Sequence, residues 1–127
     1  MTPQDIVDHT YTALVRQGGP STLSDGICAF RGNRGRKCAI GWWIPDELYS
    51  KDMEVLGLAK MGQLAELPVF KEHNELLQNL QAAHDTAARL VVTYPGAYSD
   101  WQSTLTQEIV RYTSITPTLL EGEVFCG

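Results

Sequence analysis

The first part of the chain places apolar residues at the spacing of an α-helix. This stripe is formed by Val7, Tyr11, Leu14 and Val15. Thr2 can cap the start of such a helix, with a proline and an acidic residue after it, and Gly18-Gly19-Pro20 can end it. The pattern therefore predicts an amphipathic helix with one buried face.

Two later stretches show the same period. The longer one spans about residues 69–92, and its stripe contains His73, Leu76, Leu77, Leu80, His84, Ala87 and Val91. The other opens at Ser99-Asp100-Trp101-Gln102, which has the form of a capping box, and its buried face contains Trp101, Leu105, Ile109 and Tyr112. Tyr94-Pro95-Gly96 separates the two predicted helices. A further short helix is predicted near 58–66, although Gly57 and Gly62 interrupt its pattern.

Residues 20–51 lack the helical period. Short apolar pieces at 27–30 and 38–40 flank residues 31–37, the arginine loop, in which glycines supply the positive φ angles of a tight turn. We interpret this segment as a small β-hairpin with the arginines at its tip, followed by a helical turn that starts at Pro45.

Taken together, these elements predict an α+β fold of about four helices with a small β-hairpin, in a single compact domain. No internal repeat or change of composition indicates a second domain. We expect residues 1–113 to form the globular domain and residues 114–127, the tail, to be a C-terminal extension, either loosely docked or added as an edge strand.

The distribution of charge changes this picture, because the basic residues are concentrated. The chain of 127 residues has 10 Lys and Arg against 15 Asp and Glu, a net charge of −5. Four basic residues, Arg31, Arg34, Arg36 and Lys37, lie in the arginine loop. An acidic protein with one basic island does not suit general nucleic-acid binding, which needs a broad basic face. It suits a small anionic ligand or an acidic patch on a partner protein.

Two features bear on location and on disulfides. No apolar run approaches the roughly 20 residues that span a bilayer, and the N-terminus lacks the basic start and apolar stretch of a signal peptide. We therefore expect a cytoplasmic protein with no membrane contact. Three cysteines without a secretion signal do not indicate a disulfide framework, and we interpret Cys28 and Cys38 as small buried apolar residues, leaving Cys126 unassigned.

The arginine loop and the two tryptophans after it are the first candidate site. Backbone N–H groups beside guanidinium forks bind phosphate or carboxylate well, so Arg31, Arg34, Arg36 and Lys37 are the candidate anion-binding residues. Trp42 and Trp43 could stack on a base or a sugar. The alternative is a solvated hairpin tip with one tryptophan in the core.

The second candidate is a nucleophilic site of Cys38 and His84, since Cys38 precedes a helical turn that would favour a thiolate. Adjacent helix positions point about 100° apart, so we expect Asp85 to face another element instead of orienting His84. The alternative is a structural histidine at the edge of the core. Cys28, Cys38 and one histidine form a weaker metal-binding alternative, and we predict neither a metal nor a cofactor. The acidic pair at residues 46–47 is interpreted as solvated surface.

The order of several motifs resembles a family of small proteins encoded by bacteriophages and prophages. The matching segments are Cys28-Ala29-Phe30-Arg31, Gly35-Arg36-Lys37-Cys38-Ala39-Ile40-Gly41, Ile44-Pro45-Asp46-Glu47-Leu48-Tyr49, Leu80-Gln81-Ala82-Ala83-His84-Asp85 and Trp101. The resemblance covers about residues 1–113, and it departs from the family at Trp42-Trp43, where a small residue and a leucine are usual. It implies a phage context in the cytoplasm of a host bacterium and no settled activity.

These observations lead to one main hypothesis and two alternatives. The main hypothesis is a phage-encoded counter-defence protein that sequesters a phosphate-bearing, nucleotide-derived small molecule without catalysis. The alternatives are a protein inhibitor that blocks a host defence enzyme, and a small Cys-dependent hydrolase. A homodimer is one arrangement that would complete a ligand pocket at an interface.

Overall fold

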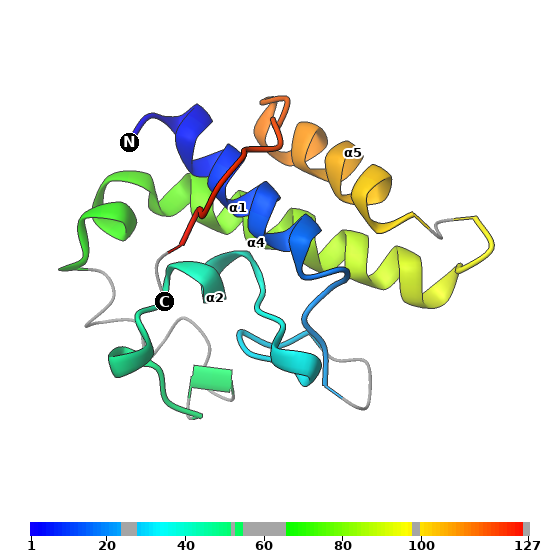
Figure 1. Cartoon of the computed structure of the whole chain (residues 1–127), viewed down its shortest axis with the longest axis horizontal. Helices are drawn as coiled ribbons and strands as arrows, with labels where there is room; N and C mark the ends of the chain where they lie inside the picture. The colour runs from blue at the N-terminus through cyan, green and yellow to red at the C-terminus, as the bar shows by residue number, and fades with distance from the viewer. Residues whose placement is uncertain (24–27, 52, 55–65, 98–99, 126–127) are drawn as a thin grey trace.

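The longest helix, α4 (Pro68–Thr93), runs through the middle of the molecule, and the other helices pack on it (Figure 1). The computed structural model describes residues 1–23, 28–51, 53–54, 66–97 and 100–125. Within these ranges the remaining helices are α1 (Pro3–Arg16), α2 (Ala39–Trp43) and α5 (Trp101–Thr113), with two short 3₁₀ helices, η1 (Asn33–Gly35) and η2 (Asp46–Leu48). The described chain is a single compact helical domain of four α-helices, which confirms the expected number.

Helix α1 begins where the sequence predicts, because its first residues form a capping box. The Thr2 hydroxyl accepts the Asp5 N–H at 3.1 Å, and the Asp5 carboxylate accepts the Thr2 N–H at 3.0 Å. Hydrogen bonding of the Asp5 carboxylate to the backbone N–H of Thr2, and secondly to its hydroxyl, lowers the pKa of Asp5 below its usual value. The predicted face is buried at Val7, Tyr11 and Leu14, which lie in the core.

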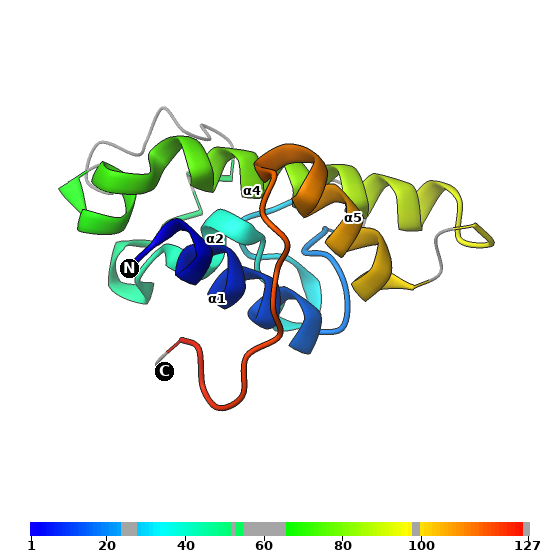
Figure 2. The ribbon, with the colours of Figure 1, turned by 90° about the horizontal axis from the view of Figure 1, so that it is seen from above.

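The core lies between α4 and the helices on either side of it. Helix α5 returns antiparallel along α4, and α1 packs beside both (Figures 1 and 2). Leu77 and Leu80 of α4 and Leu105 and Ile109 of α5 are almost completely buried. Trp101 ties α5 to α1 by donating its indole N–H to the carbonyl of Leu14 at 2.8 Å. The helices are thus joined by one continuous apolar cluster.

The predicted β-hairpin is not found in the part of the chain that the structure describes. Residues 20–23 and 28–38 contain two isolated antiparallel bridges, Thr22 with Cys28 and Arg31 with Lys37, and no β-strand. The second expected arm, 38–40, instead begins α2: Cys38 caps this helix, and its Sγ accepts the Gly41 N–H at 3.3 Å. A buried apolar run of three residues fits a helix as well as a strand, so the pattern alone could not decide.

Other boundaries agree with the sequence. Helix α4 ends at Thr93, just before the predicted stop, and η2 follows Pro45. Helix α5 begins where expected, but its N-cap is Asp100, whose carboxylate accepts the Gln102 N–H at 3.1 Å, and not the first residue of the predicted capping box at 99–102. The predicted helix near 58–66 falls almost entirely outside the described residues. No helix among those described has the length and apolar character needed to cross a membrane.

The tail lies over α1 as an extended segment instead of pairing with a strand (Figure 2). It leaves α5 at Ser114, whose positive φ of 61° ends the helix in a left-handed turn. Residues 115–125 then follow α1 and end beside α2.

Candidate functional site

The arginine loop is a tight turn that is packed against residues 21–22. A backbone hydrogen bond closes the turn, in which the Gly32 N–H donates to the Arg36 carbonyl at 2.9 Å. Gly35 and Arg34 both have a left-handed φ, of 69° and 62°. This conformation is easy for glycine and uncommon for arginine. A side chain at Gly32 would come within 2.6 Å of the Thr22 backbone. The loop is therefore fixed by backbone contacts, and Arg34 is exposed at its tip.

Arg31 is held by the protein itself. Its guanidinium lies 2.7 Å from an Asp46 carboxylate oxygen and donates to the Ile44 carbonyl at 3.3 Å. It also lies over the Tyr49 ring, 4.2 Å from the ring centre. These contacts join the arginine loop to η2, so Arg31 has a structural role before any ligand is considered.

The other two basic residues are directed toward different neighbours. Arg36 donates from Nε to the Gln17 carbonyl at 3.2 Å, and its guanidinium packs against Gly19. Lys37 places its ammonium group 4.8 Å from the centre of the Trp42 ring and 3.9 Å from Asp46. The four predicted basic residues thus do not converge on a single point.

Both tryptophans are half-buried on α2 and are oriented by α1 and the residue that follows it. Trp42 donates its indole N–H to the Gln17 side-chain oxygen at 3.1 Å, and Trp43 donates to the Thr10 hydroxyl at 2.9 Å. Gln17 also accepts the Lys37 N–H at 2.9 Å, so one amide fixes both the loop and Trp42. With their N–H groups paired inward, the rings leave part of their apolar surface for another partner.

Three of the six predicted binding residues line one pocket of about 390 Å³. This tryptophan pocket is lined by Lys37, Trp42, Trp43, Ile44, Pro45, Asp46, Glu47 and Phe125. Arg31 reaches its rim through the ion pair with Asp46, whereas Arg34 and Arg36 are not among its lining residues.

Phe125 is a residue of this pocket that the sequence analysis did not identify. Its ring stacks on Trp42 with centres 5.4 Å apart and meets Trp43 edge-on at 4.7 Å. The tail has no periodic pattern, and Phe125 is more than 80 residues from the tryptophans in sequence. No local signal could have predicted this contact.

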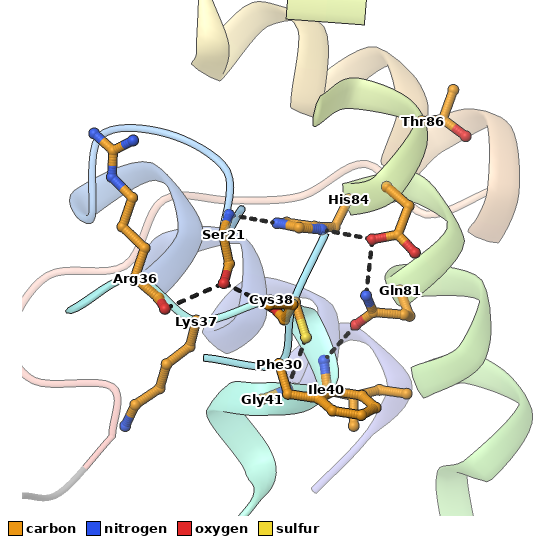
Figure 3. Close-up of polar contacts among 12 residues, drawn as sticks. Ser21, Phe30, Arg36, Lys37, Cys38, Ile40, Gly41, Gln81, His84 and Thr86 are labelled. Atoms are coloured by element: carbon orange, nitrogen blue, oxygen red, sulfur yellow. Dashed lines mark hydrogen bonds and ion pairs between the residues drawn. The ribbon is translucent and has the colours of Figure 1, made fainter. Parts of the chain in front are cut away.

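His84, the predicted general base, is completely buried in a hydrogen-bond network (Figure 3). Its Nε2 accepts the backbone N–H of Ser21 at 3.0 Å, and its Nδ1 lies 2.9 Å from an Asp85 carboxylate oxygen. Because Nε2 is the acceptor, the proton of the neutral ring is on Nδ1 and is donated to Asp85. The expectation that Asp85 would face another element was therefore wrong, since rotation about the side-chain bonds brings the two groups together despite their diverging Cα–Cβ directions.

The same network continues from Asp85 to α2. Gln81 donates its amide N–H to Asp85 at 2.9 Å and accepts the Ile40 N–H at 2.9 Å (Figure 3). The network thus connects the segment at Ser21 and the start of α2 to the middle of α4. These bonds give His84 and Gln81 a structural function.

Cys38 lies in the core with no exposed surface. Burial raises the pKa of its thiol, although the Gly41 N–H opposes this shift. A catalytic cysteine needs a thiolate that substrate can reach. The surroundings of Cys38 therefore favour a packing role.

Cys28 is the cysteine that lies beside His84 and Asp85. One ligand atom from each of these three residues lies within 4.8 Å of the other two, next to a pocket of about 380 Å³. Such a set could hold a metal in principle. However, both ring nitrogens of His84 already have partners, and metal binding at Nδ1 would require the Ser21 N–H to lose its acceptor. The arrangement fits a hydrogen-bonded thiol better than a metal ligand.

We expect Cys28 to alkylate slowly at neutral pH. Burial, reinforced by the Asp85 charge, raises the pKa of the Cys28 thiol to about 12. Thiolate forms only as the pH rises toward this value, so iodoacetamide at pH 8 should label Cys28 about a hundred-fold more slowly than an unfolded cysteine peptide. Site-resolved mass spectrometry measures this rate. Asp85→Asn removes the neighbouring charge and should speed the labelling, whereas rapid labelling of the unmodified chain would contradict the assignment.

No protein-family model, curated protein or solved structure gives a significant match to this chain. The candidate site is therefore interpreted from its own geometry.

Proposed function

We propose that this chain is a non-catalytic binding protein that captures a phosphate-bearing, nucleotide-derived small molecule in the tryptophan pocket. A phage would use it in the host cytoplasm to sequester an immune signal. The observation that supports this proposal most directly is that Lys37, Trp42 and Trp43 line the same pocket. The ring surface that Phe125 leaves uncovered is available for a base, and the Lys37 ammonium group for a phosphate.

The surrounding charges refine the proposal. Asp46 lies close to both Arg31 and Lys37, so an incoming phosphate would compete with this carboxylate for the two cations. Asp46 is 70% exposed in its side chain, and a well-solvated carboxylate contributes little to a surface ion pair. Arg34, at the exposed tip of the arginine loop, is a further candidate contact for a ligand with more than one phosphate.

The environment of the predicted catalytic residues supports capture over turnover. Cys38 is buried with a raised thiol pKa, and both ring nitrogens of His84 are engaged in the network at Ser21 and Asp85. A hydrolase that used this pair would need both groups to be released first. The hydrolase alternative is therefore the least supported.

The inhibitor alternative is favoured by a different observation. Val92 and Tyr94, at the end of α4, are each 57% exposed. Exposed aromatic and apolar side chains on an acidic protein can anchor a protein partner. A pull-down from host lysate with the wild-type chain and with Tyr94→Ala tests this alternative, because a stoichiometric partner should be lost with the variant.

The capture proposal predicts that Lys37→Met weakens ligand binding about ten-fold or more. Methionine keeps the apolar stem on Trp42 but removes the charge that would contact phosphate, and a charge-assisted hydrogen bond contributes about 1.5–3 kcal/mol. The measurement is a thermal-shift screen with nucleoside phosphates and cyclic dinucleotides, followed by titration calorimetry with any ligand that stabilises the chain. Lys71→Met, at an exposed position on α4, is the matched control and should leave the affinity unchanged.

Two results would contradict the proposal. One is an unchanged affinity in Lys37→Met, which would place the ligand elsewhere. The other is that no compound in the screen stabilises the wild-type chain. Mass spectrometry of the released ligand completes the test, because an altered product would indicate catalysis instead of capture.

A further inference from the structure

One side of α1 carries four polar residues at intervals of four positions, and all four contact the tail. We call Gln4, Asp8, Thr12 and Arg16 the α1 ladder. Gln4 donates to the Thr116 carbonyl at 2.9 Å, and Asp8 accepts the Thr118 N–H at 2.8 Å. Thr12 accepts the Leu120 N–H at 2.9 Å, and Arg16 donates to the carbonyls of Leu120 and Gly122. Every partner is a main-chain atom.

The spacing of the ladder matches that of an extended chain. Four residues of α-helix rise about 6 Å, and two residues of extended chain rise about 6.6 Å. Successive ladder residues therefore meet every second residue of the tail, at positions 116, 118, 120 and 122. The match over four steps follows from the spacing of polar residues on α1 and from the extended main chain of the tail.

Several side chains of the tail point away from this contact. Thr116 and Thr118 are exposed and Leu119 is 49% exposed, whereas Pro117 and Leu120 are half-buried. Asp8 and Thr12 are nevertheless buried, at 8% and 0% exposure. The main chain of the tail thus donates a hydrogen bond to each of two buried polar side chains of α1, and Asp8 also accepts one from Gln4 at 2.8 Å.

The last described residue of the tail, Phe125, is a side-chain anchor. Gly122 has a φ of 78°, which lets the chain turn toward α2 beyond the ladder. Figure 2 shows this turn near the C-terminal end. Beyond it, the Phe125 ring packs against the rings of Trp42 and Trp43. The contact combines main-chain docking over residues 116–122 with one aromatic residue in a pocket, the two elements by which extended peptides are recognised in general.

We propose that the α1 ladder and the tryptophan pocket form a peptide-binding surface for an extended segment of a partner protein that carries one aromatic residue. The tail occupies this surface in cis, and the partner segment replaces it. This goes beyond the proposed function, since the ligand is a polypeptide and the recognition is through its main chain. Because Trp42 and Trp43 belong to both sites, the tail and a bound nucleotide would exclude each other where they overlap.

The test releases the tail without changing the surface. Thr118→Pro with Leu120→Pro removes the two N–H groups that the tail donates to the α1 ladder, and leaves every residue of α1 and α2 intact. The probe is a synthetic peptide of residues 115–125, titrated into this full-length double variant and into the wild-type chain. A tethered segment competes at an effective concentration near 1 mM, so we expect the peptide to bind the double variant at least about ten-fold more tightly.

Three further probes define what is recognised. A peptide with Phe125→Ala should bind the double variant about five-fold or more weakly, because it lacks the aromatic anchor. A peptide that keeps the aromatic residue and the half-buried residues 117 and 120, but has unrelated side chains at the exposed positions 116, 118, 119 and 121, should bind within about three-fold of the original. Thr12→Val in the double variant should weaken the binding of all the peptides. Valine has no oxygen to accept the peptide N–H at position 120, which the Thr12 hydroxyl accepts in the wild-type chain.

Several results would overturn the proposal. These are equal affinity for the wild-type chain and the double variant, no effect of the aromatic residue, or no binding of the unrelated peptide, which would make the surface specific for its own tail. If the double variant does not fold by circular dichroism, the single Phe125→Ala chain replaces it, since that change near the end of the tail leaves the ladder contacts in place. None of these readouts depends on a nucleotide, so this proposal and the proposed function can fail separately.

Discussion

Replacing His84 with alanine is expected to lower the free energy of unfolding by about 3–5 kcal/mol, one of the two largest effects of a single substitution that the structure predicts. The ring is completely buried, and its removal leaves a cavity between α4 and the segment at Ser21. It also leaves the Ser21 N–H without an acceptor and Asp85 without the ring N–H. Urea unfolding followed by circular dichroism measures the change.

The matched control separates the cavity from the hydrogen bonds. His84→Leu fills much of the same volume but accepts no hydrogen bond, whereas His84→Gln can place an amide oxygen near the Ser21 N–H. We expect glutamine to be the less destabilising of the two if the hydrogen bonds dominate. If both variants are as stable as wild type, the structural function assigned to His84 is wrong.

Gly41→Ala is expected to destabilise the chain by about 3 kcal/mol, because the position has no space for a side chain. A Cβ at Gly41 would lie 2.2 Å from the carbonyl oxygen of Phe30 and 3.3 Å from Cys38 Sγ. The nearer contact is with backbone, which cannot move aside as a flexible side chain can. Helix α2 would have to shift away from residues 28–31, and Trp42 and Trp43 would move with it.

Gly96→Ala provides the control for this prediction. A Cβ at Gly96 meets nothing within 4 Å, so the substitution should change the free energy of unfolding by less than about 0.5 kcal/mol. Thermal unfolding of both variants under the same conditions makes the comparison. A stable Gly41→Ala chain would mean that α2 does not sit against Phe30 as described.

The helices were predictable because their signals are local. The α1 capping box involves residues three positions apart, and the apolar stripe of α4 repeats along a single element. Proline and glycine after Thr93 mark the end of α4 for similar reasons. Such patterns depend on the geometry of one helix, so they can be recognised in the sequence without knowledge of the fold.

The candidate site was predicted in part. Lys37, Trp42 and Trp43 are close in sequence, and they line one pocket. Arg31 is also close to them in sequence, but it is engaged by Asp46 and the Tyr49 ring. Residues that are close in sequence lie in one region of the fold, but their spacing does not predict the residue with which each charged side chain forms an ion pair.

By itself, the sequence determined the extents of the three long helices, the basic island and the pair of tryptophans, since each is written in neighbouring or periodic positions. Only the tertiary structure decided that 38–40 caps and begins a helix, that Asp85 bonds to His84, and that Phe125 reaches α2. The physical reason is that these outcomes depend on contacts across the fold. A short apolar run is compatible with helix or strand. The hydrogen bonds made by the main chain of the tail do not produce a recognisable pattern of side chains.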